Sequence, residues 1–267
     1  MGELRITYDR WGDGAPIVLL HGLGHRRQAW YPVVRRLAAD HDVVALDLPG
    51  FGGSAPPAAA DPYDISTLVA TVQRFCDRLG LERPHLVGNS LGGAIALELG
   101  ARGFAASVTA LSPIGFATGR TGAGTRVLAR GARLASRVPE RVWVAAAGSP
   151  PGRTVARHVL RGDPSADAAR DLVFDATVLA AGSPFVRLAV HVADYAFTAG
   201  AVPCPVTVAW GDRDRVLPAT GAVRALRRIP HARIVTLLDC GHVPMADRPN
   251  TVAAEILRTC RTLPPKR

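Results

Sequence analysis

The chain has 267 residues, 48% of them hydrophobic, which suffices for one large α/β domain with or without an inserted subdomain. It carries 32 lysine and arginine residues against 22 acidic residues, a formal net charge of +10, and Lys266 is the single lysine. The arginines are spread among acidic residues without an aromatic-rich basic motif, so no nucleic-acid partner is expected.

Membrane-spanning and secretory segments are not expected. No apolar run reaches the ~18–20 residues that cross a bilayer, and Met1–Tyr8 lacks the basic and then apolar order of a signal peptide. The four cysteines, Cys76, Cys204, Cys240 and Cys260, are widely spaced and form neither a C-x-x-C pair nor a metal-ligand pattern. They are predicted to be free thiols in a reducing compartment, which favours a cytoplasmic protein.

No metal ion or other cofactor is predicted. The sequence has no cluster of histidine and glutamate with metal-ligand spacing, and the glycines of 50–53 lack the strand and helix of a dinucleotide fingerprint. Histidines without a partner pattern receive no predicted role, and they are His25, His41, His85, His158 and His231.

The hydrophobic pattern alternates strands and helices along most of the chain. Strands are predicted near residues 3–8, 16–20, 42–46, 84–88, 106–111, 205–210 and 233–238. Helices are predicted near residues 28–39, 64–79, 91–102, 218–228 and 249–261. Short apolar runs such as Val43–Leu46 are typical of strands buried on both faces, so we expect a mostly parallel central sheet with helices on both sides.

The early segment His21–Gly24 follows the apolar strand Ile17–Leu20 and exposes backbone amides at a strand end. Such amides can form an oxyanion hole. The expected donors are the N–H groups of Leu23 and of Leu91, the residue after the predicted nucleophile, and losing one such donor costs about 2.7–4 kcal/mol of transition-state stabilisation.

Gly88–Gly92 fits the G-x-S-x-G pattern of a nucleophile elbow. A strand that turns sharply into a helix leaves almost no room for side chains beside the turning residue. Gly88 and Gly92 supply that room, and Gly93 lets the helix pack closely. The turn is expected to raise the Ser90 hydroxyl clear of the sheet at the positive end of the helix.

A serine nucleophile needs a base, and the base needs an orienting acid. His242 lies on a loop after an apolar strand near the C-terminus, and Asp212 and Asp214 lie on the loop after the strand before it. Ligand sites in parallel sheets form at the carboxyl ends of the strands, so these loops are expected to meet Ser90.

Together these segments resemble the α/β-hydrolase superfamily, and the resemblance extends over nearly the whole chain. The segments that carry it, in chain order, are the His21-Gly22 loop, the D-x-P-G-x-G-x-S turn at Asp47–Ser54, the elbow at Gly88–Gly92, Gly211–Pro218 and Gly241-His242. The resemblance implies an α/β-hydrolase fold with a core of residues 1–114 and 201–267. Residues 115–200, which contain no convincing strand, would then be an inserted helical cap subdomain.

The resemblance also implies which residues act. Gly211, Asp214 and Pro218 match the family pattern G-x-x-D-x-x-x-P in register, so Asp214 is the predicted acid and Asp212 a loop residue. Ser90 stands where epoxide hydrolases and haloalkane dehalogenases carry aspartate, which argues against both reactions. In the turn, Asp47, Pro49, Gly50 and Gly52 are predicted to be structural.

The implied function is a serine hydrolase that cleaves a carboxylic ester or related acyl compound through an acyl-enzyme, with an apolar small-molecule acyl substrate and no cofactor. One alternative is carbon–carbon bond hydrolysis, because Asn89 before Ser90 resembles the G-N-S-M-G-G elbow of meta-cleavage product hydrolases. Against it, His21–His25 lacks the G-P-G extension of that group. Another alternative is a non-catalytic ligand receptor on the same scaffold.

One stretch of the predicted cap is strongly basic. Between Gly115 and Gly162 there are nine arginines and one acidic residue, Glu140. Four of these arginines share one predicted helix face, and they are Arg126, Arg130, Arg133 and Arg137. This face would suit an anionic substrate or membrane surface, and the alternative is a solvated arginine face over an ordinary core.

Overall fold

The computed structural model describes residues 5–58, 61–116, 142, 145–146, 149–162 and 184–262. Within these ranges seven strands form one sheet in the order β1-β3-β2-β4-β5-β6-β7. Strand β1 is antiparallel to β3, and every other pair is parallel. The strands are β1 (Tyr8–Trp11), β2 (Ala15–Leu20), β3 (His41–Leu46), β4 (His85–Asn89), β5 (Ser107–Leu111), β6 (Val206–Gly211) and β7 (Arg233–Leu237).

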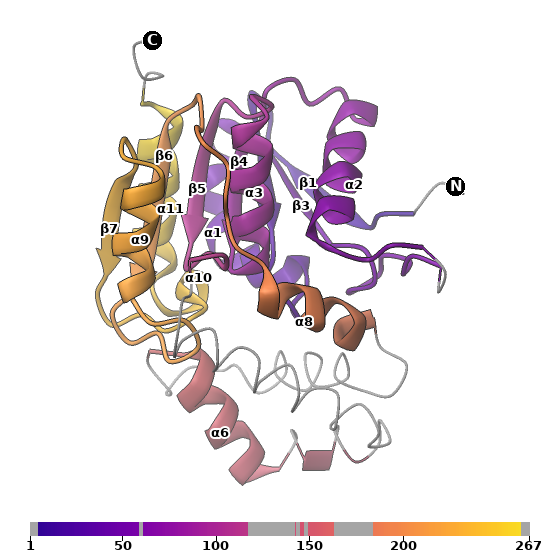
Figure 1. Ribbon diagram of the computed structural model, residues 1–267, viewed down its shortest axis with the longest axis vertical. Coiled ribbons are helices and arrows are strands. Elements are labelled where there is room, and N and C mark those ends of the chain that lie inside the picture. The colour runs from indigo at the N-terminus through magenta and orange to yellow at the C-terminus, as the bar shows by residue number, and fades with distance from the viewer. Residues whose placement is uncertain are drawn as a thin grey trace.

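Helices cover both faces of this sheet (Figure 1). Their bounds are η1 (Arg27–Trp30), α1 (Tyr31–Leu37), α2 (Ile65–Arg78), α3 (Leu91–Ala101), α6 (Pro150–Leu160), α8 (Pro184–Asp194), α9 (Thr220–Arg228), α10 (Pro244–Asp247) and α11 (Pro249–Cys260). Helices α2, α3 and α9 pack on one face, and α1 and α11 on the other. The predicted α/β-hydrolase fold with a mostly parallel sheet is confirmed.

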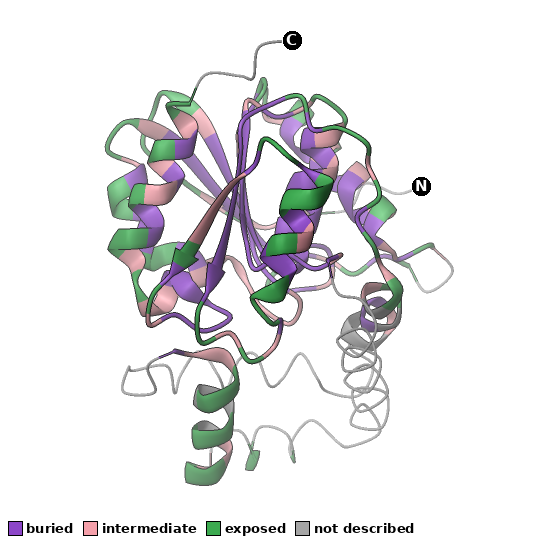
Figure 2. Cartoon of the chain, turned by 60° about the vertical axis from the view of Figure 1, so that its left-hand side comes forward, coloured by how far each residue is buried: buried purple, intermediate pink, exposed green. Residues whose placement is uncertain are grey.

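The apolar strands bury both of their faces, which explains their uninterrupted hydrophobic sequence. Val18 and Leu20 join the core beneath α2, α3 and α9, whereas Ile17 and Leu19 join the core beneath α1 and α11. Successive side chains of a strand point to opposite sides of the sheet, so four consecutive apolar residues serve two cores. In Figure 2 the central strands are buried along most of their length, and the outer surfaces of the helices are exposed.

The first strand differs from the prediction of residues 3–8. Strand β1 begins at Tyr8 and pairs with β3. Two residues before it bind the loop after β3: the Thr7 carbonyl accepts a hydrogen bond from the Asp47 amide, and the Arg5 carbonyl accepts one from the Ala55 amide. Their backbone groups are therefore used outside the sheet.

The predicted cap, residues 115–200, lies mostly outside the described residues, and so do Arg126, Arg130, Arg133 and Arg137. Two of its helices are described: α6, which is largely exposed (Figure 2), and α8, which lies below α3 in Figure 1. Within the described part of the chain no helix is both long and apolar enough to cross a membrane.

Candidate active site

Ser90 sits on a strained turn between β4 and α3. Its backbone angles, φ 54° and ψ −111°, lie in a region that residues with a side chain rarely adopt. The surrounding backbone is packed too tightly for side chains. A Cβ on Gly88 would lie 2.1 Å from the Gly92 carbonyl carbon, and a Cβ on Gly92 would lie 2.1 Å from the Leu20 carbonyl oxygen. The fold therefore holds the strained serine in place from both sides.

This packing makes a stability prediction. Replacing Gly92 by alanine should lower the free energy of unfolding by about 3 kcal/mol or more, because the added methyl group meets backbone of β2 that cannot rotate away. The control is Gly200→Ala, since a Cβ on Gly200 has no atom within 4 Å. Denaturant unfolding of both variants measures the difference, and equal stabilities would contradict this account of the elbow.

The loop after β2 lies directly against the nucleophile. A Cβ on Gly22 would be 3.3 Å from the Cβ of Ser90. The loop makes a turn in which the His25 amide donates to the Gly22 carbonyl at 3.1 Å, and Gly24 has the positive φ of 76° that such a turn takes at its third residue. The Leu23 amide, at the second residue of this turn, is not the one that closes it.

The second predicted oxyanion donor begins helix α3. Leu91 is its first residue, directly after Ser90 at the N-cap, so its N–H has no intrahelical acceptor. The positive end of the helix dipole lies at the same point and favours negative charge there. The structure thus brings both loops that carry the predicted donors, Leu23 and Leu91, to the side of Ser90.

His21 holds the early loop in place and is buried. Its Nε2 accepts a hydrogen bond from the Leu48 amide at 2.9 Å, which leaves Nδ1 to donate to the Gly22 carbonyl at 2.8 Å. Burial lowers the pKa of His21 to about 4, so the ring is neutral at pH 7 and keeps this tautomer. Its role is structural, and it joins the early loop to the turn at Asp47–Ser54.

That turn is organised by the buried carboxylate of Asp47. The carboxylate accepts hydrogen bonds from the Arg27 amide at 2.7 Å, the Arg27 side chain at 2.5 Å and the Gly53 amide at 2.8 Å. Gly52 has no room for a side chain, because its Cβ would lie 2.1 Å from this carboxylate. The structure thus places Asp47 and Gly52 in the framework of the turn.

The predicted base and acid are in contact. Nδ1 of His242 lies 2.9 Å from Oδ2 of Asp214. The other carboxylate oxygen of Asp214 accepts from the Val216 amide at 2.9 Å and the Leu217 amide at 2.8 Å. Asp212 has a different partner, the Cys240 amide, at 3.2 Å.

The environment of Asp214 keeps its carboxylate charged. Burial alone would raise the pKa of Asp214, but the hydrogen bond and charge of His242, together with the Leu217 amide, hold this pKa below its usual value. The Asp214 side chain is fully buried and that of His242 is 8% exposed. A buried anion beside Nδ1 is suited to orient the imidazole and to stabilise its protonated form.

Two residues that position the histidine loop were not predicted. The Asn89 side chain donates to the His242 carbonyl at 2.9 Å and to the Leu111 carbonyl at 3.2 Å, so it joins three strand ends. The buried Asp247 carboxylate accepts from the Gly241 amide at 2.8 Å and from Arg161 at 2.9 Å. The sequence does not reveal either positioning role, because each side chain binds partners distant in the chain.

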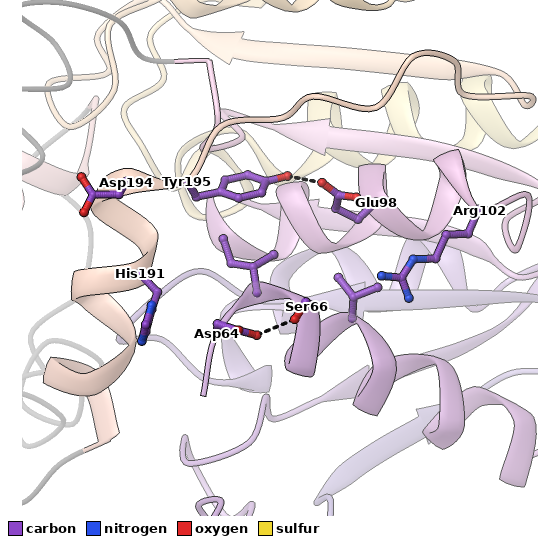
Figure 3. Close-up of a pocket in the computed structure, with 9 residues that line it drawn as sticks. Asp64, Ser66, Glu98, Arg102, His191, Asp194 and Tyr195 are labelled. Atoms are coloured by element: carbon purple, nitrogen blue, oxygen red, sulfur yellow. Dashed lines mark hydrogen bonds between the residues drawn. The ribbon is translucent and has the colours of Figure 1, made fainter. Parts of the chain in front are cut away.

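A pocket of about 560 Å³ lies elsewhere, between α2, α3 and α8 (Figure 3). Its polar groups largely bind one another: the Tyr195 hydroxyl donates to Glu98 at 2.7 Å, and the Ser66 hydroxyl donates to Asp64 at 2.7 Å. Its lining contains none of Ser90, Asp214 and His242. We therefore assign no chemistry to it.

Comparison with known proteins agrees with this fold. A sequence model described as "Alpha/beta hydrolase family" matches residues 17–255. The chain belongs to this family. Two curated relatives, from Cupriavidus necator and Pseudomonas putida, are named as the dihydrolipoyllysine-residue acetyltransferase component of an acetoin cleaving system. The first is 40% identical over 42% of the chain and 30% of its own length, and the second is 27% identical over 97% of the chain and 67% of its own length.

Other relatives of this alpha/beta hydrolase family member carry esterase and phospholipase names. A pimeloyl-[acyl-carrier protein] methyl ester esterase from Aeromonas hydrophila is 38% identical over 36% of the chain and 36% of its own length. A crystal structure described as a membrane phospholipase A, a bacterial virulence factor, superposes with a TM-score of 0.78. It is 28% identical and covers 97% of the chain and 84% of the phospholipase chain. The alignments thus span less than two thirds of several curated relatives.

Proposed function

We propose that this protein is a serine hydrolase that cleaves a carboxylic ester through an acyl-enzyme. The contact between His242 Nδ1 and Asp214 Oδ2, in a loop joined to the elbow through Asn89, is the observation that carries the proposal. It supplies an oriented base, the elbow supplies a serine held in a strained conformation, and these are the parts that acyl transfer needs.

The proposed reaction proceeds in two halves. His242 takes the proton from Ser90 as its hydroxyl oxygen attacks the ester carbonyl, and the Leu23 and Leu91 amides stabilise the oxyanion. His242 then protonates the alkoxide leaving group, and the acyl group stays on Ser90. Water, activated by the same imidazole, attacks the acyl-enzyme and releases the carboxylic acid, while Asp214 keeps its charge throughout.

The substrate is proposed to be a small molecule with an apolar acyl group. The names of the relatives support the class of substrate, since one is a methyl ester esterase and one a phospholipase. Within this proposal the arginines of residues 126–137 favour an anionic ester or lipid surface. We also propose a cytoplasmic location, on the basis of the reduced cysteines, of which Cys76, Cys204 and Cys240 are buried.

A panel of p-nitrophenyl esters of increasing acyl length, assayed with purified protein, tests the proposal. We expect saturable turnover with a clear optimum in acyl length, and for an anionic lipid ester a kcat/KM that falls with salt, because exposed charge is screened over about 8 Å at physiological ionic strength. Binding without turnover across the panel would favour the receptor alternative. Turnover confined to a vinylogous diketone of the meta-cleavage type would favour carbon–carbon hydrolysis and overturn the ester proposal.

A further inference from the structure

Three potential metal ligands converge at the amino ends of the strands, on the side of the sheet opposite the catalytic loops. They are His41, His85 and Cys260, and one ligand atom from each lies within 4.8 Å of the others. They come from β3, β4 and the end of α11, far apart in the chain. The catalytic segments follow the carboxyl ends of strands, whereas His41 and His85 are the first residues of theirs.

The register of the sheet explains why the two histidines meet. Strand β2 lies between β3 and β4 and pairs its Ala15 with His41 and its Ile17 with His85. Residues two apart in a strand face the same side, so both imidazoles project from the face that α1 and α11 cover. Their ring centroids are 6.1 Å apart with the planes at 75°. Cys260, the last residue of α11, lies over this face.

The hydrogen bonds of the two rings leave nitrogen atoms for a further ligand. Nδ1 of His41 is buried and has no hydrogen-bond partner among the described residues. Nδ1 of His85 lies 2.8 Å from the Ser107 hydroxyl. In the tautomer that donates this bond, Nε2 of His85 keeps its lone pair, and the hydroxyl fixes the plane of the ring as outer-shell partners of metal-bound histidines do.

We propose that His41, His85 and Cys260 bind one zinc ion. Two imidazoles and a thiolate are a ligand set that suits this borderline-soft cation, and a water molecule would complete the tetrahedron. Bond lengths of about 2.0–2.3 Å would place the ligand atoms roughly 3.3–3.8 Å apart. Side-chain rotations that close each gap by about an ångström satisfy this, because all three residues are only half-buried.

The zinc ion would act as a structural cross-link. It would join α11 to β3 and β4, which β2 separates in the sheet, and it would stabilise the fold without entering the hydrolysis. The proposal does not depend on the proposed esterase function, because the whole length of β4 separates His85 from Ser90.

Two titrations of metal-free protein, kept reduced with a phosphine, test the proposal. Zinc chloride binding is measured by calorimetry, and cobalt chloride binding is followed by visible and ultraviolet absorption. We expect one equivalent of zinc to bind and the cobalt form to show a thiolate-to-metal charge-transfer band with the intense visible bands of tetrahedral coordination. The variants Cys260→Ser, His41→Gln and His85→Gln should each weaken binding at least about 100-fold. The matched controls Cys204→Ser and His158→Gln should bind as the wild type does.

Two further readouts keep the result clear even if a variant folds poorly. Zinc at about 100 times its Kd should raise the Tm of the wild type by roughly 5–10 °C and leave the Tm of Cys260→Ser unchanged. Ser90→Ala should bind zinc normally, so a failure of the hydrolase proposal would leave this one intact. Absence of the charge-transfer band in the wild type, or unchanged zinc binding in Cys260→Ser, would overturn the proposal.

Discussion

Replacement of Ser90 by alanine should abolish covalent labelling by a fluorophosphonate probe and lower kcat on an activated ester on the order of 10⁵-fold or more. Within the described chain Ser90 is the serine that combines an elbow, a helix N-terminus and the neighbouring His242 loop. Alanine removes the oxygen that attacks the carbonyl. A water molecule activated by His242 is not held in place as the serine oxygen is, so it cannot restore the rate. Mass spectrometry of the labelled protein and steady-state kinetics measure the two effects.

A matched serine gives the control. Ser112 is also buried, also follows a strand and also has a positive φ, 43°, but the described residues directly after it, 113–116, are not helical. Ser112→Ala should therefore keep the covalent label. If Ser90→Ala were still labelled while Ser112→Ala were not, the nucleophile would have been assigned to the wrong strand.

The parts of the fold that sequence predicts well are those that local pattern determines. Val43–Leu46 is uniformly apolar because it serves two cores, and Gly88 and Gly92 are glycine because backbone fills the space that a side chain would need. Such requirements act on neighbouring residues and appear as motifs. The first strand was misplaced because the residues before Tyr8 take their hydrogen-bond partners from the loop at 47–55, which hydrophobic pattern does not reveal.

Residues that act across the fold leave no such pattern. Asn89 suggests a family subgroup from sequence, yet its amide group holds the His242 and Leu111 carbonyls together. Asp247 is the last residue of α10 and resembles an ordinary polar surface residue in the sequence, although it binds Gly241 and Arg161. The pairing of β2 with β3 and β4 also brings His41 and His85 close to Cys260. The spacing of these three residues along the chain does not indicate that they meet.

The choice between the two aspartates of the loop after β6 leads to the second prediction. Asp214→Asn should lower kcat on an activated ester on the order of 10⁴-fold, whereas Asp212→Asn should change it by less than about tenfold. The Asp214 carboxylate accepts a hydrogen bond from Nδ1–H of His242, so Nε2 is left unprotonated and can accept the serine proton. An asparagine amide would instead donate to Nδ1, and the proton would move to Nε2, where it blocks general-base catalysis.

Asp212 is a stringent control because it has the same side chain as Asp214, whereas the hydrogen bond to His242 is made by Asp214. The two lie on the same loop, but Asp212 is exposed and accepts a hydrogen bond from the Cys240 amide, which an asparagine oxygen can also accept. Circular dichroism and thermal unfolding of both variants should match the wild type within a few degrees, because each exchange preserves shape. With folding intact, a larger loss of kcat in Asp212→Asn than in Asp214→Asn would mean that the acid acts from the other side of the turn. The contact of His242 with Asp214 would then be only structural.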